Sequence, residues 1–464
     1  MVEMGAVVCV DFGSTFTKAS LVDLQTGEML ASASHPTTIP GADGVGDVLD
    51  GFDSCLADLT RQDARTQDAE VLACSSAGGG LRIAVVGNEE LVTAEAGRRV
   101  ALSSGGKVVA VLSGGLDAEP YAELCDALPD VLLLVGGTDG GNSSQLIGDA
   151  EFLADARWSG PVVVAGDIEA QERVAAAFEE SQTPYVLADN VVPKIGVLAA
   201  EPARAAIREM FLAHVIGGKH LSKRADFTAM VRGATPDVVL TGVELLARGL
   251  DESRPGAGDV VVVDVGGATT DVHSVVEVDP EESGLAREVV ATTPVTRTVE
   301  GDLGMRWSAV STVEAADLEL AEAAERRRND PGFLPDSAAE VEVDEAIARA
   351  AIGLALKRHA GRSKVVLSPE GRVVERTGKD LREIDLLVGS GGALRNGAAG
   401  VVDRVLLPAT GEHDGGWQLP RAPRVVVDHD YVLAAAGLLF PAHPAAAYAL
   451  VRALAEGTSS GVGE

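Results

Sequence analysis

Two widely separated segments place an aspartate at the end of an apolar run and follow it with a glycine turn. Asp11 follows the apolar residues 6–10 and begins the stretch Asp-Phe-Gly-Ser-Thr-Phe-Thr-Lys, which ends at Lys18. Asp264 follows a similar run and begins Asp-Val-Gly-Gly-Ala-Thr-Thr-Asp, which ends at Asp271. Proteins hold Mg²⁺ with one or two carboxylates while the ion keeps several waters. Asp11 and Asp264 therefore predict a Mg²⁺ site beside bound phosphates, with orientation of an attacking water as a second role for Asp264.

The turns after these aspartates can bind anions through their backbone. Successive N–H groups in a tight turn form a concave anion site, and glycine lets a ligand approach closely. Phosphate-binding positions are expected at Gly13, Ser14, Thr15, Gly266, Gly267, Ala268 and Thr269. Lys18 can reach back to phosphate oxygens. The alternative is a pair of ordinary glycine turns, with Lys18 solvated and Asp271 a structural residue of its hairpin.

A third glycine cluster follows an apolar run near the end of the chain. Gly389, Ser390, Gly391 and Gly392 come after the apolar residues 386–388 and precede a short helical pattern. Glycines at such a position let the backbone approach a flat base and ribose, although similar loops also cap strands in many α/β folds. As the third member of an ordered set, this loop completes a predicted site for ATP with Mg²⁺.

Two further loops carry charged residues that can take part in chemistry. Asp139 lies between glycines in residues 136–142, directly after the apolar run 131–135, and either orients a hydrolytic water or forms a turn. Residues 297–306 carry Glu300 and Asp302 between two arginines. This loop has three interpretations: a nucleotide-sensing loop, a partner surface, or an internally paired set of charges.

The pattern of elements predicts an α/β fold that has been duplicated. Each half begins with a strand, an acid, a glycine turn and two more strands, and each later has a buried strand that ends in glycines. In the second half, the third strand is expected at residues 288–294. Strands alternate with helices between the halves, at residues 81–86, 108–112, 131–135 and 162–165, which predicts parallel βα units. The predicted domains are 1–235, with inserted βα units around 81–190, then 236–455, and a disordered tail at 456–464.

Composition limits the partners and the compartment. The chain has 464 residues, a formal net charge of −32 and 46% hydrophobic residues, so it can bury more than one core. This charge repels phosphate backbones and anionic lipid, which excludes nucleic acids and membrane surfaces as expected partners. The four scattered cysteines fit a reducing compartment. We expect a cytoplasmic protein, for which an oligomer is compatible with the sequence.

The three glycine motifs resemble the two phosphate motifs and the adenosine motif of the actin, sugar-kinase and Hsp70 superfamily. That resemblance implies ribonuclease-H-like (actin-like ATPase) domains with ATP and Mg²⁺ in an interdomain cleft. A closer resemblance, to the MutL family of glutamate mutase accessory proteins, covers most of the chain. It rests on segments 11–18, 74–82, 134–142, 263–274, 297–306 and 431–437. That family is distinct from the mismatch-repair protein of the same name.

The family resemblance implies an ATP-driven chaperone that reactivates an adenosylcobalamin-dependent mutase, such as a glutamate mutase or an aminomutase. Asp11, Asp264 and Asp139 are the expected catalytic positions of a weak ATPase. Two other functions remain open at this point: a small-molecule kinase of the same superfamily, and a scaffold that binds ATP without hydrolysing it. Substrate-dependent ADP release would favour the kinase, and negligible turnover would favour the scaffold.

Overall fold

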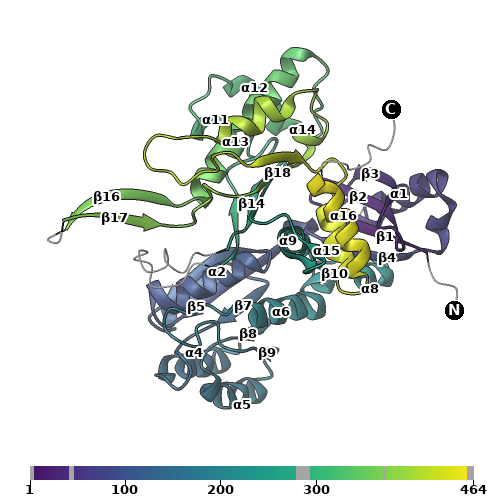
Figure 1. Cartoon of the computed structure of the whole chain (residues 1–464). Coiled ribbons are helices and arrows are strands. Elements are labelled where there is room, and N and C mark those ends of the chain that lie inside the picture. Colours follow the sequence, from purple (N-terminus) through teal and green to yellow (C-terminus); the bar gives the residue numbers. More distant parts are fainter. Residues whose placement is uncertain (1–4, 41–45, 278–292, 369–370, 457–464) are drawn as a thin grey trace. The chain divides into compact units, whose positions relative to one another are not determined.

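The structure is a computed structural model, which describes residues 5–40, 46–277, 293–368 and 371–456 (Figure 1). The chain divides into two compact units. Unit 1 comprises the described parts of Met1–Val22 and Leu30–Val238 with Thr293, and unit 2 comprises those of Asp23–Met29, Val239–Arg287 and Pro294–Glu464. The strand expected at 288–294 lies outside the described residues as far as 292. The predicted tail 456–464 also lies outside them, apart from Glu456.

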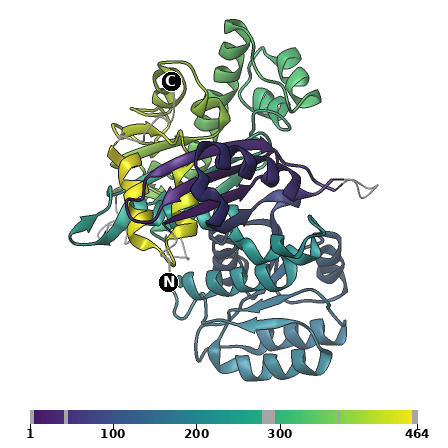
Figure 2. The same cartoon turned by 90° about the vertical axis from the view of Figure 1, so that its right-hand side faces the viewer.

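The first sheet of unit 1 has the strand order β10-β4-β1-β2-β3. Its strands are β1 (Ala6–Phe12), β2 (Phe16–Asp23), β3 (Met29–Pro36), β4 (Glu70–Ser75) and β10 (Val231–Ala234). Strand β4 pairs in parallel with β1 on one side and with β10 on the other. Only residues 13–15 join β1 to β2, and so short a link between neighbouring strands makes a hairpin. Helix α1 (Val48–Gln62) lies against this sheet (Figure 2), and its buried apolar residues belong to the same hydrophobic cluster as those of β1 and β2.

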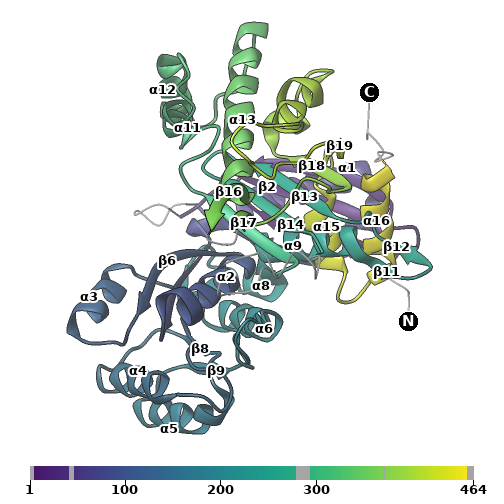
Figure 3. The same cartoon turned by 60° about the vertical axis from the view of Figure 1, so that its left-hand side comes forward.

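A second sheet of unit 1 is entirely parallel and has the order β6-β5-β7-β8-β9. Its strands are β5 (Leu81–Gly87), β6 (Gly106–Ser113), β7 (Val131–Leu134), β8 (Val162–Val164) and β9 (Tyr185–Leu187). The crossover helices are α2 (Glu95–Ser103), α3 (Ala118–Asp126), α4 (Ser144–Asp155) and α5 (Gln171–Ser181) (Figure 3). The predicted alternation of strands and helices is therefore confirmed. Because all the strands are parallel, their carboxyl ends meet at one edge, which we call the carboxyl edge of the inserted sheet.

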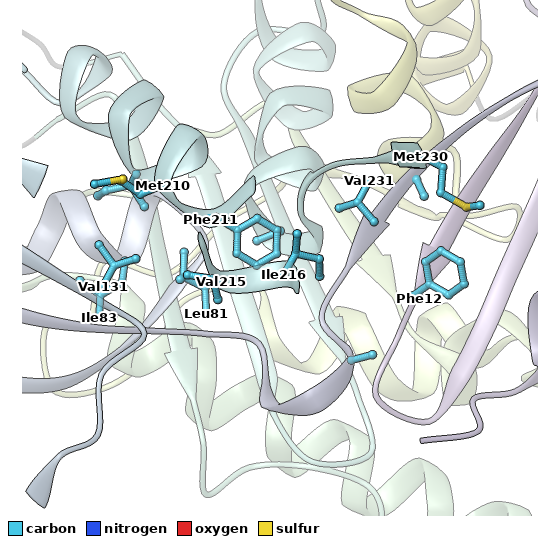
Figure 4. Packing of buried hydrophobic residues seen from close by; sticks show 14 of the residues in the cluster. Phe12, Leu81, Ile83, Val131, Met210, Phe211, Val215, Ile216, Met230 and Val231 are labelled. Atoms are coloured by element: carbon cyan, nitrogen blue, oxygen red, sulfur yellow. The ribbon is translucent and has the colours of Figure 1, made fainter. Parts of the chain in front are cut away.

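One hydrophobic core serves both sheets of unit 1. Phe12 of the first sheet and Ile83 of the inserted sheet belong to the same buried cluster, with Phe211 between them (Figure 4). The helical segments that follow the inserted sheet are α6 (Glu201–Met210), a π-helical turn (Phe211–Val215), α7 (Ile216–Gly218) and α8 (Ala225–Met230). Phe12 also meets Phe227 edge to face, with ring centroids 5.2 Å apart. With so few aromatic residues, most of this core consists of Val, Leu, Ile and Ala, as buried parallel strands require.

The sheet of unit 2 repeats the strand order of the first sheet of unit 1. Its order is β15-β14-β13-β18-β19, with β13 (Val260–Val265), β14 (Thr270–Val275), β15 (Val295–Glu300), β18 (Leu386–Ser390) and β19 (Arg424–Val427). The first three strands are antiparallel, while β13, β18 and β19 are parallel. In both sheets the first strand of the hairpin is central and a parallel strand lies on its other side. The predicted duplicated α/β fold is therefore confirmed.

Helices of unit 2 cover its sheet. The long helix α13 (Ala338–His359) buries Ile347 and Ile352 against Val263 and Val272 of the sheet. The other helices are α9 (Thr235–Arg248), which begins in unit 1, α11 (Ala309–Ala315), α12 (Ala321–Asn329), α14 (Gly392–Arg395), α15 (Val432–Leu439) and α16 (Pro444–Glu456). Two separate ribbons are β11 (Gly249–Asp251) with β12 (Arg254–Pro255), and β16 (Arg362–Ser368) with β17 (Gly371–Thr377). Among the helices described, none combines the length and apolarity that a membrane crossing requires.

Candidate functional site

The first hairpin turns between β1 and β2 through Gly13, Ser14 and Thr15. The Gly13 N–H donates to the Phe16 carbonyl at 3.2 Å and closes the turn. A Cβ atom on Gly13 would lie 2.6 Å from that same carbonyl oxygen, so the turn requires glycine. Within the described part of the chain, the amides of Ser14 and Thr15 donate to no acceptor. Ser14 is exposed, and Thr15 is half-buried.

Asp11 is held in place on the same strand end. Thr235, at the start of α9, donates its hydroxyl to Oδ1 of Asp11 at 2.6 Å. Nζ of Lys18 lies 3.8 Å from Oδ2 of Asp11, which is an ion pair at the loose end of the range. The thiol of Cys74 donates to Oδ1 at 3.7 Å, and burial together with the Asp11 charge raises the pKa of that thiol. The carboxylate therefore has one oxygen bound to its own unit and the other beside a cation.

The second hairpin has the same closing bond as the first. The Gly266 N–H donates to the Thr269 carbonyl at 2.9 Å, as Gly13 does to Phe16. The two glycines occupy equivalent positions, two residues after Asp264 and Asp11. Among residues whose placement is described, the amides of Gly267 and Ala268 have no acceptor. Each hairpin thus uses its glycine N–H internally and leaves the next two amides available.

Residues 301–308 are hydrogen-bonded to the turn of the second hairpin. The amides of Met305 and Arg306 donate to the carbonyls of Gly266 and Gly267 at 3.0 and 2.8 Å, and the Ser308 hydroxyl donates to the carbonyl of Ala268 at 2.6 Å. Three successive carbonyls of the turn are therefore occupied. This brace, residues 301–308, fixes the plane of each peptide in the turn, so the amides need little reorganisation to meet an anion.

The charges around this brace are paired within unit 2. Arg358 donates to Glu300 and to Asp302, with nitrogen–oxygen distances of 2.6 Å. Arg297 donates to Asp271 at 2.6 Å, and Arg306 donates to Asp344 at 2.9 Å. Of the three interpretations of residues 297–306, the internally paired loop fits these contacts. Asp271 is accordingly a structural residue of the hairpin.

Asp264 stands at the carboxyl end of β13, where two neighbouring strands also end. It pairs in register with Ser390, the last residue of β18. Asp428, which follows β19, is 1% exposed, and its N–H donates to the Gly389 carbonyl at 2.9 Å. Its carboxyl accepts the N–H of Val432 at 2.9 Å. Burial, with the charges of Asp430 and Asp264 adding, raises the pKa of Asp428 to about 6.

The third glycine loop continues from β18 into α14. Gly391 has φ +108°, and a Cβ atom there would lie 2.3 Å from the Val265 carbonyl oxygen, so this position requires glycine. The guanidinium carbon of Arg395 lies 4.7 Å from the ring centroid of Tyr431. His429 also contacts the Arg395 carbonyl through Nδ1 at 3.1 Å. The loop therefore stands beside a stacked cation and aromatic ring.

Asp139 lies in the inserted sheet, away from the strands that carry Asp11. Its Oδ1 accepts Nδ2 of Asn190 at 2.8 Å and the N–H of Ile168 at 3.3 Å. Its own N–H donates to the Pro193 carbonyl at 3.2 Å. The side chain is exposed, but one carboxylate oxygen is already engaged in holding loops together.

Comparison with known proteins identifies the family. A family model described as MutL protein matches residues 7–454. The protein named Protein MutL from Clostridium tetanomorphum is 35% identical over 457 residues, which cover 94% of this chain and 96% of that protein. The chain belongs to the MutL family. The match includes all three glycine motifs, the brace and Asp428.

Solved structures resemble this MutL-family chain at low identity. The ethanolamine utilization protein EutJ from Carboxydothermus hydrogenoformans is 11% identical, with coverage of 93% of this chain and 88% of EutJ and a TM-score of 0.30. The activator of 2-hydroxyisocaproyl-CoA dehydratase from Clostridium difficile, solved with ADPNP, is 10% identical, with coverage of 95% of each chain and a TM-score of 0.31. At these scores neither likeness bears on function.

The predicted site residues of this MutL-family chain fall into three groups. Unit 1 brings Asp11, Lys18 and the first turn together, and unit 2 brings Asp264, the second turn and the third loop to one edge of its sheet. Asp139 belongs to the inserted sheet instead. Sequence reasoning missed Thr235 and Asp428. The Thr235-Pro236 pair marks a helix start, but nothing in the sequence places that start beside Asp11.

Proposed function

We propose that this MutL-family protein binds ATP with Mg²⁺ through its two hairpins and third loop, and hydrolyses it slowly as an accessory factor of an adenosylcobalamin-dependent mutase. The observation that carries the proposal is the identical closing bond in the two hairpins. Gly13 and Gly266 each donate to a carbonyl three residues on, beside an aspartate at the end of a central strand.

The carboxylates fit a magnesium ion that keeps its waters. Among the described residues, no group of three or more His, Cys, Asp or Glu side chains is placed to hold a metal. Mg²⁺ beside nucleotides is bound by one or two carboxylates plus phosphates and water, and needs no such cage. Asp11, with its Oδ2 facing Lys18, and Asp264 are the residues that would hold it through water. The bound ion would neutralise charge that develops on the phosphates.

The backbone amides carry the phosphates in this proposal. Ser14 and Thr15 in one hairpin, and Gly267 and Ala268 in the other, are the amides without acceptors among described residues. Phosphoryl transfer needs positioning and charge neutralisation more than covalent help, so this inventory suffices for slow hydrolysis. Lys18 would add a positive charge near the phosphate oxygens.

Asp264 is the better candidate to orient the attacking water. Oδ1 of Asp139 is bound by Asn190 and Ile168, whereas Asp264 stands beside the second turn. The third loop would receive the base, because no atom lies within 4 Å of the Cβ position of Gly392 and Arg395 with Tyr431 offers a flat surface. Aromatic and guanidinium planes stack well on nucleobases.

Family membership supports a mutase as the proposed partner. The sequence resembles the MutL family of glutamate mutase accessory proteins, and an ATP-driven cycle of domain closure and opening is a common way to couple hydrolysis to a partner. We propose that the partner is a subunit of an adenosylcobalamin-dependent mutase and that the chain helps it discard damaged cofactor.

Phosphate release from ATP with Mg²⁺ tests this function. Wild type is compared with Asp11→Asn and Asp264→Asn, each with and without a purified cobalamin-dependent mutase. We expect turnover that the mutase raises and that both variants lose by at least about tenfold, as for removal of one charged group at a transition state. No turnover in any condition would overturn the ATPase and leave a binding scaffold. ADP release that depends on a small hydroxyl compound would replace it with a kinase.

A further inference from the structure

Asp139 joins three loops at the carboxyl edge of the inserted sheet. It bonds the loop after β8 through the N–H of Ile168, and the loop after β9 through Asn190 and the Pro193 carbonyl. Asn190 is itself buried, and its Nδ2 also donates to the Gly137 carbonyl at 3.0 Å. These bonds fix the loops after β7, β8 and β9 relative to one another.

The loop after β9 presents apolar side chains to solvent. The N–H of Ala199 donates to the Val191 carbonyl at 2.9 Å, which closes the loop at its base. At its tip, Ile195 is 79% exposed and Val197 is 46% exposed. Large apolar groups exposed at the tip of a loop gain nothing from burial within the chain.

A third exposed apolar residue lies in the loop after β8. Ile168 is 49% exposed, and Asp139 bonds both to its N–H and to the carbonyl of Pro193, two residues before Ile195. Ile168, Ile195 and Val197 form what we call the edge patch. Exposed apolar groups gathered in one place mark interaction sites, whereas single ones are ordinary.

The charges beside the edge patch are mainly acidic. Exposed Asp139, Glu169 and Asp189 lie in the loops that carry the patch, and Lys194 is the exposed cation on the same loop. The chain as a whole carries −32. A second copy of the chain would bring like charges together, which costs binding energy, while a basic rim would gain it.

We propose that the edge patch docks a partner protein whose matching surface is apolar with Lys or Arg at its rim. Taking the partner to be a subunit of the cobalamin-dependent mutase rests on the proposed function. The patch belongs to the inserted sheet, so it lies on different strands from the two hairpins.

The test measures the binding of purified mutase subunits to three full-length chains by biolayer interferometry. The chains are wild type, Ile195→Ser/Val197→Ser, and the control Leu128→Ser. Leu128 is 73% exposed but precedes β7, at the opposite edge of the inserted sheet. ATP affinity is measured on the same samples, since all three should keep it.

We expect the double variant to bind the mutase at least about tenfold more weakly, as for loss of a central apolar anchor, with the control unchanged. Raised salt should slow wild-type association, because complementary charges steer encounter. Equal binding by all three chains would overturn the edge patch and leave the proposed function standing. Absence of binding by wild type, with ATP affinity intact, would remove the mutase both as occupant of the patch and as partner.

Discussion

Thr235 donates its hydroxyl to Oδ1 of Asp11 at 2.6 Å, across 224 positions of sequence. The bond joins the aspartate of the first hairpin to the first residue of α9. With Lys18 beside the other oxygen, the carboxylate is oriented before any ligand arrives. An acid held in this way needs less reorganisation when it meets a hydrated cation.

Thr235→Ala should lower ATP turnover by about tenfold, because a hydrogen bond to a charged acceptor contributes about 1.5–3 kcal/mol. The measurement is steady-state phosphate release at saturating ATP and Mg²⁺. Thr235→Ser keeps the hydroxyl and should remain within about twofold of wild type. Equal rates for Thr235→Ala and wild type would show that Asp11 does not depend on this contact.

Gly304→Ala should disturb the second hairpin through the brace. A Cβ atom at Gly304 would lie 2.8 Å from both the Gly267 oxygen and the carbonyl carbon of Ala268. Overpacking of this kind costs about 1–3 kcal/mol, so both the free energy of unfolding and ATP affinity should fall. Gly301→Ala is the matched control, since no atom lies within 4 Å of its Cβ position. Unchanged ATP affinity in Gly304→Ala would argue against the second hairpin as a phosphate site.

Substitutions of the two neighbouring glycines of the third loop should have different effects, one on folding and the other on nucleotide binding. Gly391→Ala meets the Val265 carbonyl at 2.3 Å with φ +108°, so it should lower the unfolding temperature. Gly392→Ala meets no atom within 4 Å and should fold normally while its methyl group hinders a base. Thermal unfolding and nucleotide titration of both variants check this. A Gly392→Ala chain with wild-type affinity would move the base away from this loop.

Stability should fall in mild acid because of a buried histidine. Burial, with Lys379 and His273 adding, lowers the pKa of His359 to about 3, against about 6.5 in the unfolded chain. Between these values the unfolded chain binds a proton that the folded chain does not, so the free energy of unfolding falls as pH is lowered. From pH 7.5 to 5.5 this group should cost about 1.4 kcal/mol.

His359→Gln removes the titrating imidazole and keeps polar atoms for Ser274 and Thr298. In the wild-type chain the hydroxyls of these two residues are hydrogen-bonded to the imidazole nitrogens at 2.8 and 2.9 Å. Urea unfolding at the two pH values compares the variant with wild type. His273 and Asp428 titrate in both chains, so the difference isolates His359. The same loss of stability with acid in both chains would contradict a neutral buried imidazole at this position.

Local sequence patterns predicted the strands and helices of this fold but not the contacts between residues far apart in the chain. The strands that carry Asp11 and Asp264 were predicted correctly, because an apolar run followed by a glycine turn is a local signal. The brace could not be predicted from the sequence. The backbone amides of Met305 and Arg306 donate to the carbonyls of Gly266 and Gly267, and such bonds do not require particular side chains.

Asp139 and Asp428 illustrate that the sequence does not show which strand ends lie side by side. The sequence predicts a catalytic role for Asp139 because it lies among glycines at a strand end, and the structure adds its contacts with loops of its own sheet. The sequence pattern does not single out Asp428, although the order of parallel strands brings it to the edge that carries Asp264. Sheet order decides which strand ends are neighbours, and sequence alone does not give that order.

Calorimetric titration with a non-hydrolysable ATP analogue and Mg²⁺ tests the central claim most directly, with wild type beside Asp11→Asn, Asp264→Asn and the surface control Asp251→Asn. If both hairpins hold one nucleotide, wild type and control should bind one analogue per chain. Each hairpin variant should then bind at least about tenfold more weakly, a loss of about 1.4 kcal/mol. Wild-type affinity in either hairpin variant, or two sites per chain, would contradict a shared site.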